Sequence, residues 1–253
     1  MPAPAIELRN LSKSFGELPV LDRISLDAAR GEFVSLLGPS GCGKSTIFSI
    51  LNGIERSDDG EVLLDGRPLD RASSPVAWMP QRDVLFPWRT VAQNVALGGE
   101  VAGRLSRREA REQAHALLPT FGLGEFGDLR PYQLSGGMRQ RAALARTVAQ
   151  GRDILLLDEP FGALDALTRT ELQLWLEQIW ERERWTVVLI THDVREAVLL
   201  SDRVYVMGPR AAGITHELKI PLPRPRTLEL FGDAEAAALE LQLLHALHAG
   251  RTA

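Results

Sequence analysis

The feature that most constrains this chain is the loop Gly38-Pro-Ser-Gly-Cys-Gly-Lys-Ser45, which directly follows the apolar run Phe33–Leu37. The loop matches the phosphate-binding pattern G-x-x-x-x-G-K-[ST]. Its glycines let backbone N–H groups converge on phosphate oxygens without obstruction by a Cβ, and a helix beginning near Lys44 adds its positive N-terminal end. The pattern therefore predicts a strand, a nucleotide cradle and a helix in that order. The alternative is an ordinary glycine turn before a helix.

The pattern predicts specific roles for the last residues of the cradle. We expect Lys44 to reach the β- and γ-phosphates and the Ser45 hydroxyl to ligate Mg²⁺. The cofactors predicted from the loop are therefore ATP and Mg²⁺. The nucleotide contacts expected here are Gly38, Pro39, Ser40, Gly41, Cys42, Gly43, Lys44, Ser45 and Thr46.

A second apolar run, Ile154–Leu157, ends in two acids and supplies the other half of a nucleotide site. Asp158 is placed to hold Mg²⁺, usually through water. Glu159 follows, where a carboxylate can orient or deprotonate the attacking water. The alternative is a buried strand that is capped by two solvated acids. Together with the cradle, this segment predicts an ATPase.

The segment Leu134-Ser-Gly-Gly-Met-Arg-Gln-Arg141 precedes a long helix rich in Ala, Arg and Leu. Ser135, Gly136 and Gly137 at a helix start combine a hydroxyl, free backbone N–H groups and a helix dipole, which together form a second anion site. One chain would then carry two phosphate-recognition devices for one nucleotide. A head-to-tail pair of chains resolves this, with each ATP held between one chain's cradle and the other's Ser-Gly-Gly. Taken alone, such a helix start is more often only a cap.

Composition excludes several classes of protein. The net charge is −4, so the chain lacks the excess of basic residues that is typical of a nucleic-acid-binding protein. Cys42 is the only cysteine, so no intramolecular disulfide forms and a reducing compartment fits. No N-terminal signal pattern is recognisable, and no stretch reaches the roughly 18 apolar residues of a spanning helix. We expect any membrane role to come through a partner.

Short apolar runs alternate with helical patterns along the chain, which indicates a mostly parallel sheet covered on both faces. Strands are expected at Val76–Met79, Val187–Ile190 and Val204–Met207, besides the two runs above. Residues 91–150 instead read as several helices without a convincing strand. Beyond Pro221 an extended Pro/Arg connector leads into a packed amphipathic helix at 234–249.

At this point the sequence resembles the ABC ATPase family over nearly its whole length. The family's ordered motifs are the cradle, the Asp-Glu strand end and the Ser-Gly-Gly helix start, together with Phe15, Gln81, Gly162-Ala-Leu-Asp165 and His192. The resemblance implies an α/β P-loop ATPase (RecA-like) core with a mostly parallel sheet, an N-terminal antiparallel β subdomain and an inserted helical subdomain. The implied bounds within the single nucleotide-binding domain 1–253 are 1–83 and 151–210 for the ATP-binding core, 84–150 for the helical subdomain and 211–253 for a C-terminal extension.

The resemblance also implies roles for three of these side chains. Phe15 stacks on adenine, where the family more often has Tyr, and Gln81 senses the γ-phosphate and Mg²⁺ beside the membrane partner. His192 contacts the γ-phosphate. Taken singly, Phe15 also fits a core position, Gln81 a surface amide and His192 a hydrogen-bonded strand end. The implied catalytic set is Glu159, His192, Lys44 and Gln81, and the implied metal ligands are Ser45, Gln81 and Asp158.

Within the family, the chain is similar to ATP-hydrolysing subunits that import nitrate, sulfonates, taurine and related small solutes. The similar stretches are Phe86–Val95, Glu159–Arg169 and the Pro-Arg-Pro-Arg226 tail. Subunits for thiamine-precursor uptake share much of this pattern, and an iron–sulfur assembly ATPase is the non-transport alternative. The implied partners are a second copy of the chain, transmembrane permease subunits and, indirectly, an extracytoplasmic solute-binding protein, with no nucleic acid. The implied location is the cytoplasmic face of the cell membrane, as a peripheral subunit.

The stretch Phe86-Pro-Trp88 places two large aromatic residues shortly after Gln81. Buried, they would be ordinary packing between the core and the helical region. Exposed, they would form an apolar patch beside the γ-phosphate sensor. We therefore predict that Arg82–Val95, termed the docking segment below, is the surface on which a cytoplasmic helix of the membrane partner binds.

Overall fold

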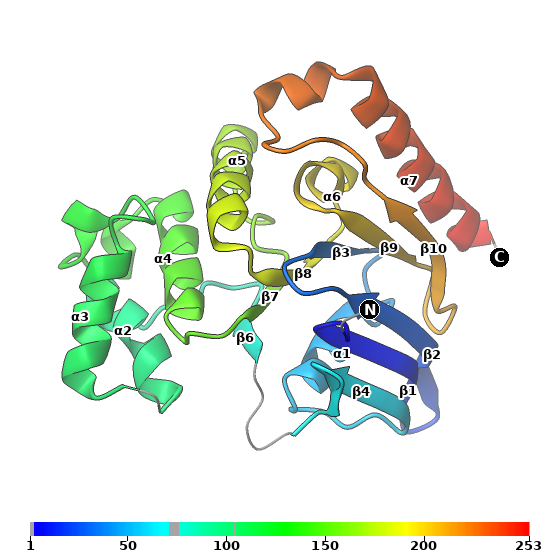
Figure 1. Cartoon of the computed structure of the whole chain (residues 1–253), viewed down its shortest axis with the longest axis horizontal. Coiled ribbons are helices and arrows are strands. Elements are labelled where there is room, and N and C mark those ends of the chain that lie inside the picture. Colours follow the sequence, from blue (N-terminus) through cyan, green and yellow to red (C-terminus); the bar gives the residue numbers. More distant parts are fainter. Residues whose placement is uncertain (1–2, 71–75, 104, 253) are drawn as a thin grey trace. The chain divides into compact units, whose positions relative to one another are not determined.

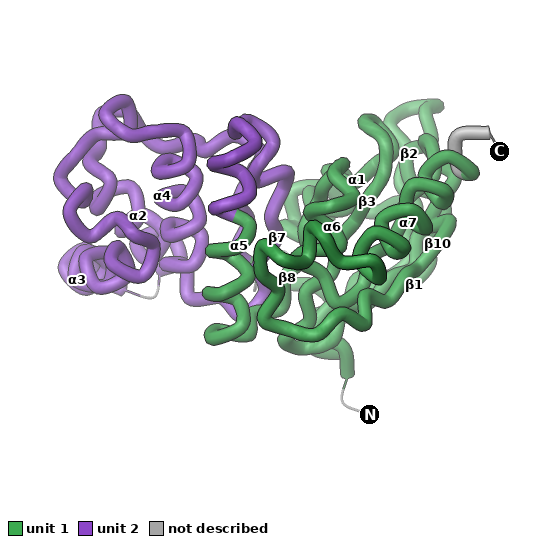
Figure 2. The backbone as a smooth tube through the Cα atoms, turned by 90° about the horizontal axis from the view of Figure 1, so that it is seen from above, with its two compact units in different colours: residues 1–76, 173–253 green, residues 77–172 purple. Residues whose placement is uncertain are grey.

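The computed structural model describes residues 3–70, 76–103 and 105–252. They form two compact units, which Figure 2 distinguishes by colour. Unit 1 combines the chain up to Val76 with the chain from Gln173 onward, and unit 2 is the continuous stretch Ala77–Leu172. Unit 2 is wider than the expected helical subdomain 84–150, since it includes a strand on each side of it. The subdomain bounds themselves stay a prediction.

Unit 1 contains parallel strands whose apolar sequences were recognisable as short continuous runs. β3 pairs in parallel with β8 and with β9, and β10 runs antiparallel to β9. Every residue of β3 and of β8 is buried, as expected for parallel strands that are covered on both faces. The bounds are β3 Phe33–Leu37, β8 Thr186–Thr191, β9 Arg203–Met207 and β10 Ile214–Lys219, and the helices after β3 and β8 are α1 Lys44–Leu51 and α6 Val194–Leu200 (Figure 1).

The N-terminal part of unit 1 is the expected antiparallel sheet, with strand order β2-β1-β4-β5. Ile6 and Leu8 of β1 alternate toward the core, but strict alternation would next bury Asn10. A register shift after Leu8, with Asn10 at φ 50°, places Leu11 inside instead. The strands are β1 Ile6–Phe15, β2 Leu18–Ala28, β4 Asp59–Leu64 and β5 Arg67–Pro68.

Unit 2 carries its helices between two neighbouring strands, β6 and β7. The helical character predicted for 91–150 is confirmed for the residues described there. Ser135, Thr90 and Ser106 each cap a helix start by accepting a hydrogen bond from a backbone N–H. The elements are β6 Val76–Met79, α2 Val91–Val101, α3 Arg107–Leu117, the short 3₁₀ turns Gly124–Phe126 and Pro131–Gln133, α4 Gly136–Val148 and β7 Ile154–Asp158, and α5 Ala166–Glu183 leads into unit 1.

The C-terminal extension ends in α7 (Ala234–Thr252), which follows the extended connector and the 3₁₀ turn Leu228–Gly232. The apolar side of α7 packs on α6 and β9 through Ala236, Leu239 and Leu243 (Figure 1). This confirms a packed amphipathic helix. None of the described helices has both the length and the apolar character needed to cross a membrane.

Replacing Leu243 should test how much this packing stabilises unit 1. Leu243 is 1% exposed, so Leu243→Ala should lower the free energy of unfolding by about 2–5 kcal/mol through lost burial and a cavity. Leu241→Ala is the matched control, because Leu241 lies on the same helix and is 53% exposed; its effect should stay within about 0.5 kcal/mol. Urea denaturation followed by circular dichroism measures both, and equal effects would contradict the packing.

Candidate functional site

The predicted cradle is a tight loop between β3 and α1. Gly41 and Gly43 have φ values of 77° and 108°, the left-handed region that glycine tolerates, and α1 begins after Gly43 without a side-chain cap. Lys44 is 6% exposed, and its Nζ donates hydrogen bonds to the carbonyls of Gly38 and Pro39, both at 2.8 Å. The loop thus holds a buried ammonium group and leaves the first N–H groups of α1 without a protein side chain to cap them. Ser45 is exposed at this end of α1.

Gly43 joins the cradle to the antiparallel sheet. A Cβ on Gly43 would lie 2.6 Å from Leu21 Cδ2 and 3.1 Å from the Val20 carbonyl oxygen, so β2 is in direct contact with the loop. β2 pairs with β1, which ends at Phe15. The Phe15 ring is 46% exposed, and Lys13 Nζ lies 5.2 Å from its centroid. Adenine stacking requires an exposed aromatic ring near the phosphate site. Phe15 offers such a ring on the antiparallel sheet that packs against the cradle.

Arg210 also lies close to the cradle, which the sequence analysis did not foresee. Its Nη2 atom is 3.9 Å from the position that a Cβ on Gly41 would occupy. The side chain is exposed in the turn between β9 and β10. It brings a second cationic group to a loop whose sequence pattern predicts phosphate binding.

His192 stands at the end of β8, immediately before α6, and its side chain is exposed. Its neighbours are fixed by hydrogen bonds. Asp193 caps α6 by accepting from the N–H groups of Arg195 and Glu196, and the Asp193 N–H donates to Thr191 Oγ1 at 3.0 Å. Thr191 Oγ1 and Glu196 Oε2 are 2.8 Å apart. The backbone on both sides of His192 is therefore held in place.

Three predicted residues lie together in unit 2. Asp158 is buried at the end of β7, and Glu159 follows with φ 43°, a left-handed conformation that is uncommon outside glycine. Gln81 Nε2 donates to Glu159 Oε2 at 3.2 Å. Glu159 thus combines a strained backbone with a carboxylate that the Gln81 amide orients. Such strain is typical of functional sites.

The Ser-Gly-Gly segment forms the expected helix start on α4. Ser135 is exposed, and its hydroxyl accepts a hydrogen bond from Met138 N–H at 3.2 Å. Gly137 is buried, and a Cβ there would lie 2.7 Å from Thr168 Cγ2. The segment therefore needs glycine for packing as well as for backbone access.

Two arginines on α4, which sequence reasoning missed, hold the start of the docking segment. Arg146 donates to the carbonyls of Asp83 and Val84, each at 2.7 Å. Arg139 Nε lies 3.2 Å from Asp83 Oδ2. Burial lowers the pKa of Arg146, and the Asp83 charge partly opposes this. The segment after Gln81 is thus fixed to the helix that begins at Ser135.

The docking segment presents a stacked aromatic pair, of which Trp88 is exposed and Phe86 is half-buried. The rings of Phe86 and Trp88 stack at 5.1 Å with an interplanar angle of 10°, and Trp88 is 67% exposed. Beside Trp88 lies a cavity of about 340 Å³ that is also lined by Arg89, Arg107 and Arg111. These residues favour the exposed alternative over ordinary core packing, at least for Trp88.

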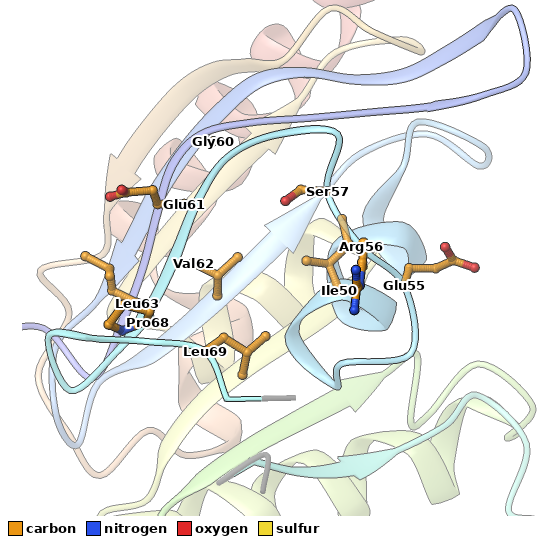
Figure 3. A pocket seen from close by; sticks show the side chains of 10 residues that line it. All are labelled: Ile50, Glu55, Arg56, Ser57, Gly60, Glu61, Val62, Leu63, Pro68 and Leu69. Carbon is orange, nitrogen blue, oxygen red and sulfur yellow. The ribbon is translucent and has the colours of Figure 1, made fainter. Parts of the chain in front are cut away.

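Another cavity, of about 320 Å³, lies in unit 1 between the end of α1 and β4 (Figure 3). Ile50, Val62 and Leu69 form part of its lining, and Arg56 contributes a charge. None of the predicted site residues lines it. In unit 1 the predicted residues are Phe15, the cradle 38–46 and His192, and in unit 2 they are Gln81, 135–137, Asp158 and Glu159.

Comparisons with known proteins identify the family of this chain. The model of the ABC transporter family matches residues 21–162. An aliphatic sulfonates import ATP-binding protein of Agrobacterium fabrum is 46% identical over 243 residues, which cover 96% of this chain and 83% of the relative. A putative ATP-binding protein of Brucella abortus is 45% identical over 245 residues, covering 97% and 94% of the two chains.

Solved structures show the same fold. A dimeric ATP-binding cassette in a post-hydrolysis state, bound to ADP and Pi, has a TM-score of 0.73 at 31% identity and covers 86% of this chain and 100% of that chain. The protein cbiO1 of Clostridium perfringens, part of an ABC transporter complex, has a TM-score of 0.78 at 26% identity. That match covers 97% of this chain and 98% of the solved chain.

Adding one methyl group to the cradle should weaken nucleotide binding. Gly43→Ala introduces a Cβ 2.6 Å from Leu21 Cδ2 at φ 108°, so the loop must shift. We expect ATP affinity to fall at least about tenfold, or roughly 1.4 kcal/mol. Gly103→Ala is the control, because Gly103 also has a positive φ, of 67°, but open space around it. Titration with a fluorescent ATP analogue measures both, and unchanged affinity in Gly43→Ala would show that the loop is not the cradle.

Proposed function

Because this chain belongs to the ABC transporter family as an ATP-binding subunit and ATPase, we propose that it drives the import of an aliphatic sulfonate or a related small solute. The observation that best supports this site is the glycine loop closed around Lys44, which contacts β2 at Gly43 and has the left-handed backbone that glycine tolerates. The direction of transport and the kind of solute are suggested by the names of relatives that cover almost the entire chain, among them sulfonate import ATP-binding proteins of Agrobacterium fabrum and Cupriavidus pinatubonensis.

In the proposed site the cradle binds the phosphates of ATP. The N–H groups at the start of α1 and the Lys44 ammonium neutralise the β- and γ-phosphates, and the Phe15 ring stacks on adenine. Ser45, Gln81 and Asp158 provide a hydroxyl, an amide and a carboxylate, which are oxygen donors of the kind Mg²⁺ prefers. When bound, Mg²⁺ supplies charge neutralisation on the phosphate oxygens.

Hydrolysis is proposed to depend on Glu159 and His192. The Glu159 carboxylate orients the attacking water and accepts its proton, and the Gln81 amide fixes that carboxylate at 3.2 Å. His192 donates a hydrogen bond to the γ-phosphate, so that the transferred group stays in line with the water. The left-handed backbone at Glu159 directs its side chain at some cost in stability, which fits a functional position.

We further propose that two copies of the chain work head to tail. The exposed Ser135 hydroxyl and the start of α4 form an anion site that the chain's own cradle does not require. In a head-to-tail dimer this site completes the cage around the partner's nucleotide, and the solved dimeric cassettes support such a pairing. Binding of two ATP molecules then favours the closed pair, and hydrolysis releases it.

The docking segment is the proposed contact with the transmembrane permease subunits. Trp88 offers an exposed aromatic surface. The cavity beside it is lined by three arginines and one acid, Glu100, which pairs with Arg89, so Arg107 and Arg111 favour an acidic group on the partner. Since Arg146 fixes this segment to α4, permease movement and the Ser135 site are linked through one helix. The chain would then act at the cytoplasmic face of the membrane, with a separate extracytoplasmic protein delivering the solute.

Glu159→Gln should separate ATP binding from hydrolysis. Glutamine keeps the shape and can still accept the Gln81 hydrogen bond, but it cannot take a proton, so kcat should fall about 10²- to 10⁴-fold. ATP affinity should change little, and an ATP-bound dimer should accumulate on size-exclusion chromatography with Mg-ATP. Glu125→Gln, an exposed acid of the same unit, should behave as wild type. A wild-type hydrolysis rate in Glu159→Gln would remove this acid from the catalytic role.

Removing the aromatic pair should separate transport from hydrolysis. The double variant Phe86→Ala/Trp88→Ala should keep the ATPase activity of the free subunit but lose ATP-driven uptake of an alkanesulfonate in the reconstituted complex, because the docking surface is gone. Val101→Ala, which is 76% exposed outside this segment, is the control and should transport normally. Uptake that survives in the double variant would contradict docking at this segment, and failure of the wild-type complex to import alkanesulfonates would contradict the proposed solute.

A further inference from the structure

The extended connector, Ile220–Thr227, termed the strap below, binds the C-terminal end of α6. Arg226 is 3% exposed and donates to the carbonyls of Val198, Leu199 and Ser201 at 2.7–3.1 Å. Its other terminal nitrogen donates to two carbonyls of the strap itself, those of Ile220 and Leu222. One guanidinium group therefore joins the end of α6 to the strap.

Arg224 completes the same contact. It donates to the Leu200 carbonyl at 2.7 Å, pairs with Glu177 and Asp202, and lies 4.0 Å from the centre of the Trp180 ring. Together the two arginines bind the consecutive carbonyls from Val198 to Ser201. A helix leaves its last carbonyls without internal partners, and cations are favourable at that end.

The guanidinium of Arg226 is charged at neutral pH in this buried place. Burial is the main cause that lowers its pKa to about 10, and the charge of Arg224 acts in the same direction. Keeping a desolvated cation costs free energy, which the hydrogen bonds to five carbonyls offset. Such a site is more elaborate than tethering a connector requires.

The opposite end of α6 adjoins His192. Helix α6 has seven residues, Val194–Leu200, and is about 10 Å long, so its two ends belong to one short rigid segment. A helix of this length does not persist by itself and depends on tertiary contacts for its position. Part of those contacts comes from the C-terminal extension, because the strap holds its end and Ala236, Leu239 and Leu243 of α7 cover its apolar side, while β3 and β8 contact it as well.

We propose that Arg226 is a positioning residue for His192. Through Arg226, the C-terminal extension contributes to the ATPase site. The proposal rests on the proposed role of His192 at the γ-phosphate. Arg226 fixes one end of α6, α6 fixes Asp193 and Thr191 through its capping hydrogen bonds, and these two residues flank His192. Loss of the Arg226 donors lets α6 slide or tilt, which displaces the imidazole.

A double-mutant cycle on the full chain tests this coupling. Arg226→Met keeps an apolar stem without donors, and a displaced imidazole should lower the single-turnover hydrolysis rate about 10- to 100-fold. ATP affinity should change less than about threefold, because the cradle is untouched. In a His192→Ala background the same substitution should have almost no further effect. Equal losses in both backgrounds would overturn the proposal.

Two variants control for stability and folding. Leu118→Ala removes a buried side chain of unit 2 and lies outside both the cluster that covers α6 and the proposed nucleotide site, so its hydrolysis rate should stay near wild type at a temperature where it is folded. Arg226→Lys keeps the charge with fewer donors and should give an intermediate rate. If Arg226→Met does not fold, the cycle is run with Arg226→Lys, and additive losses there overturn the proposal as well.

A spectroscopic measurement separates this proposal from the role of His192 itself. In protein labelled with ¹³C-histidine, Arg226→Met should shift or broaden the ring resonance of His192 and leave that of His115 unchanged. An unmoved His192 resonance overturns the coupling, whatever the rates show. If His192→Ala hydrolyses ATP like wild type, the proposed role of His192 fails, and a displaced resonance would still support positioning by the strap.

Discussion

The absence of space at Gly43 is the constraint on which the rest of the nucleotide site depends. The start of α1 meets Val20 and Leu21 of β2 at this residue, and no side chain fits between them. The backbone there is left-handed, and the buried Lys44 binds two carbonyls of the same loop. Because the antiparallel sheet touches the loop at the same place, the proposed adenine and phosphate contacts would both depend on this one junction.

The strands and helix starts around the proposed site were predictable because each depends on residues that are close together in the sequence. Phe33–Leu37 and Ile154–Leu157 are short apolar runs that fully buried parallel strands require, and both are strands. The helix starts at Lys44 and Gly136 follow from glycine and serine at the preceding positions. The grouping of Gln81 with Glu159 was expected only from family resemblance, and the structure shows their hydrogen bond. The roles of the site residues stay predictions.

The contacts that sequence reasoning missed have a common cause. Arg146 and Arg226 bind backbone carbonyls, and every residue of a chain carries one, so no pattern of side chains marks the receiving position. Arg210 comes from a turn that is remote from the cradle in the sequence. The bulge at Asn10 was missed for a related reason, since alternation of apolar residues does not reveal where a strand inserts an extra residue. Long-range partners of this kind depend on the assembled fold.

The contact between α2 and α4 in unit 2 has a consequence for how a displacement of one helix would affect the other. At Gly98 a Cβ would lie 2.1 Å from the backbone carbonyl oxygen of Arg146, so α2 touches the main chain of α4 without side chains between them. Side chains between helices can change rotamer and absorb a displacement, whereas two touching backbones cannot. The end of α2, which continues the docking segment, is therefore in main-chain contact with the later turns of α4. A displacement of one helix at this point would act on the other directly, without a layer of side chains between them.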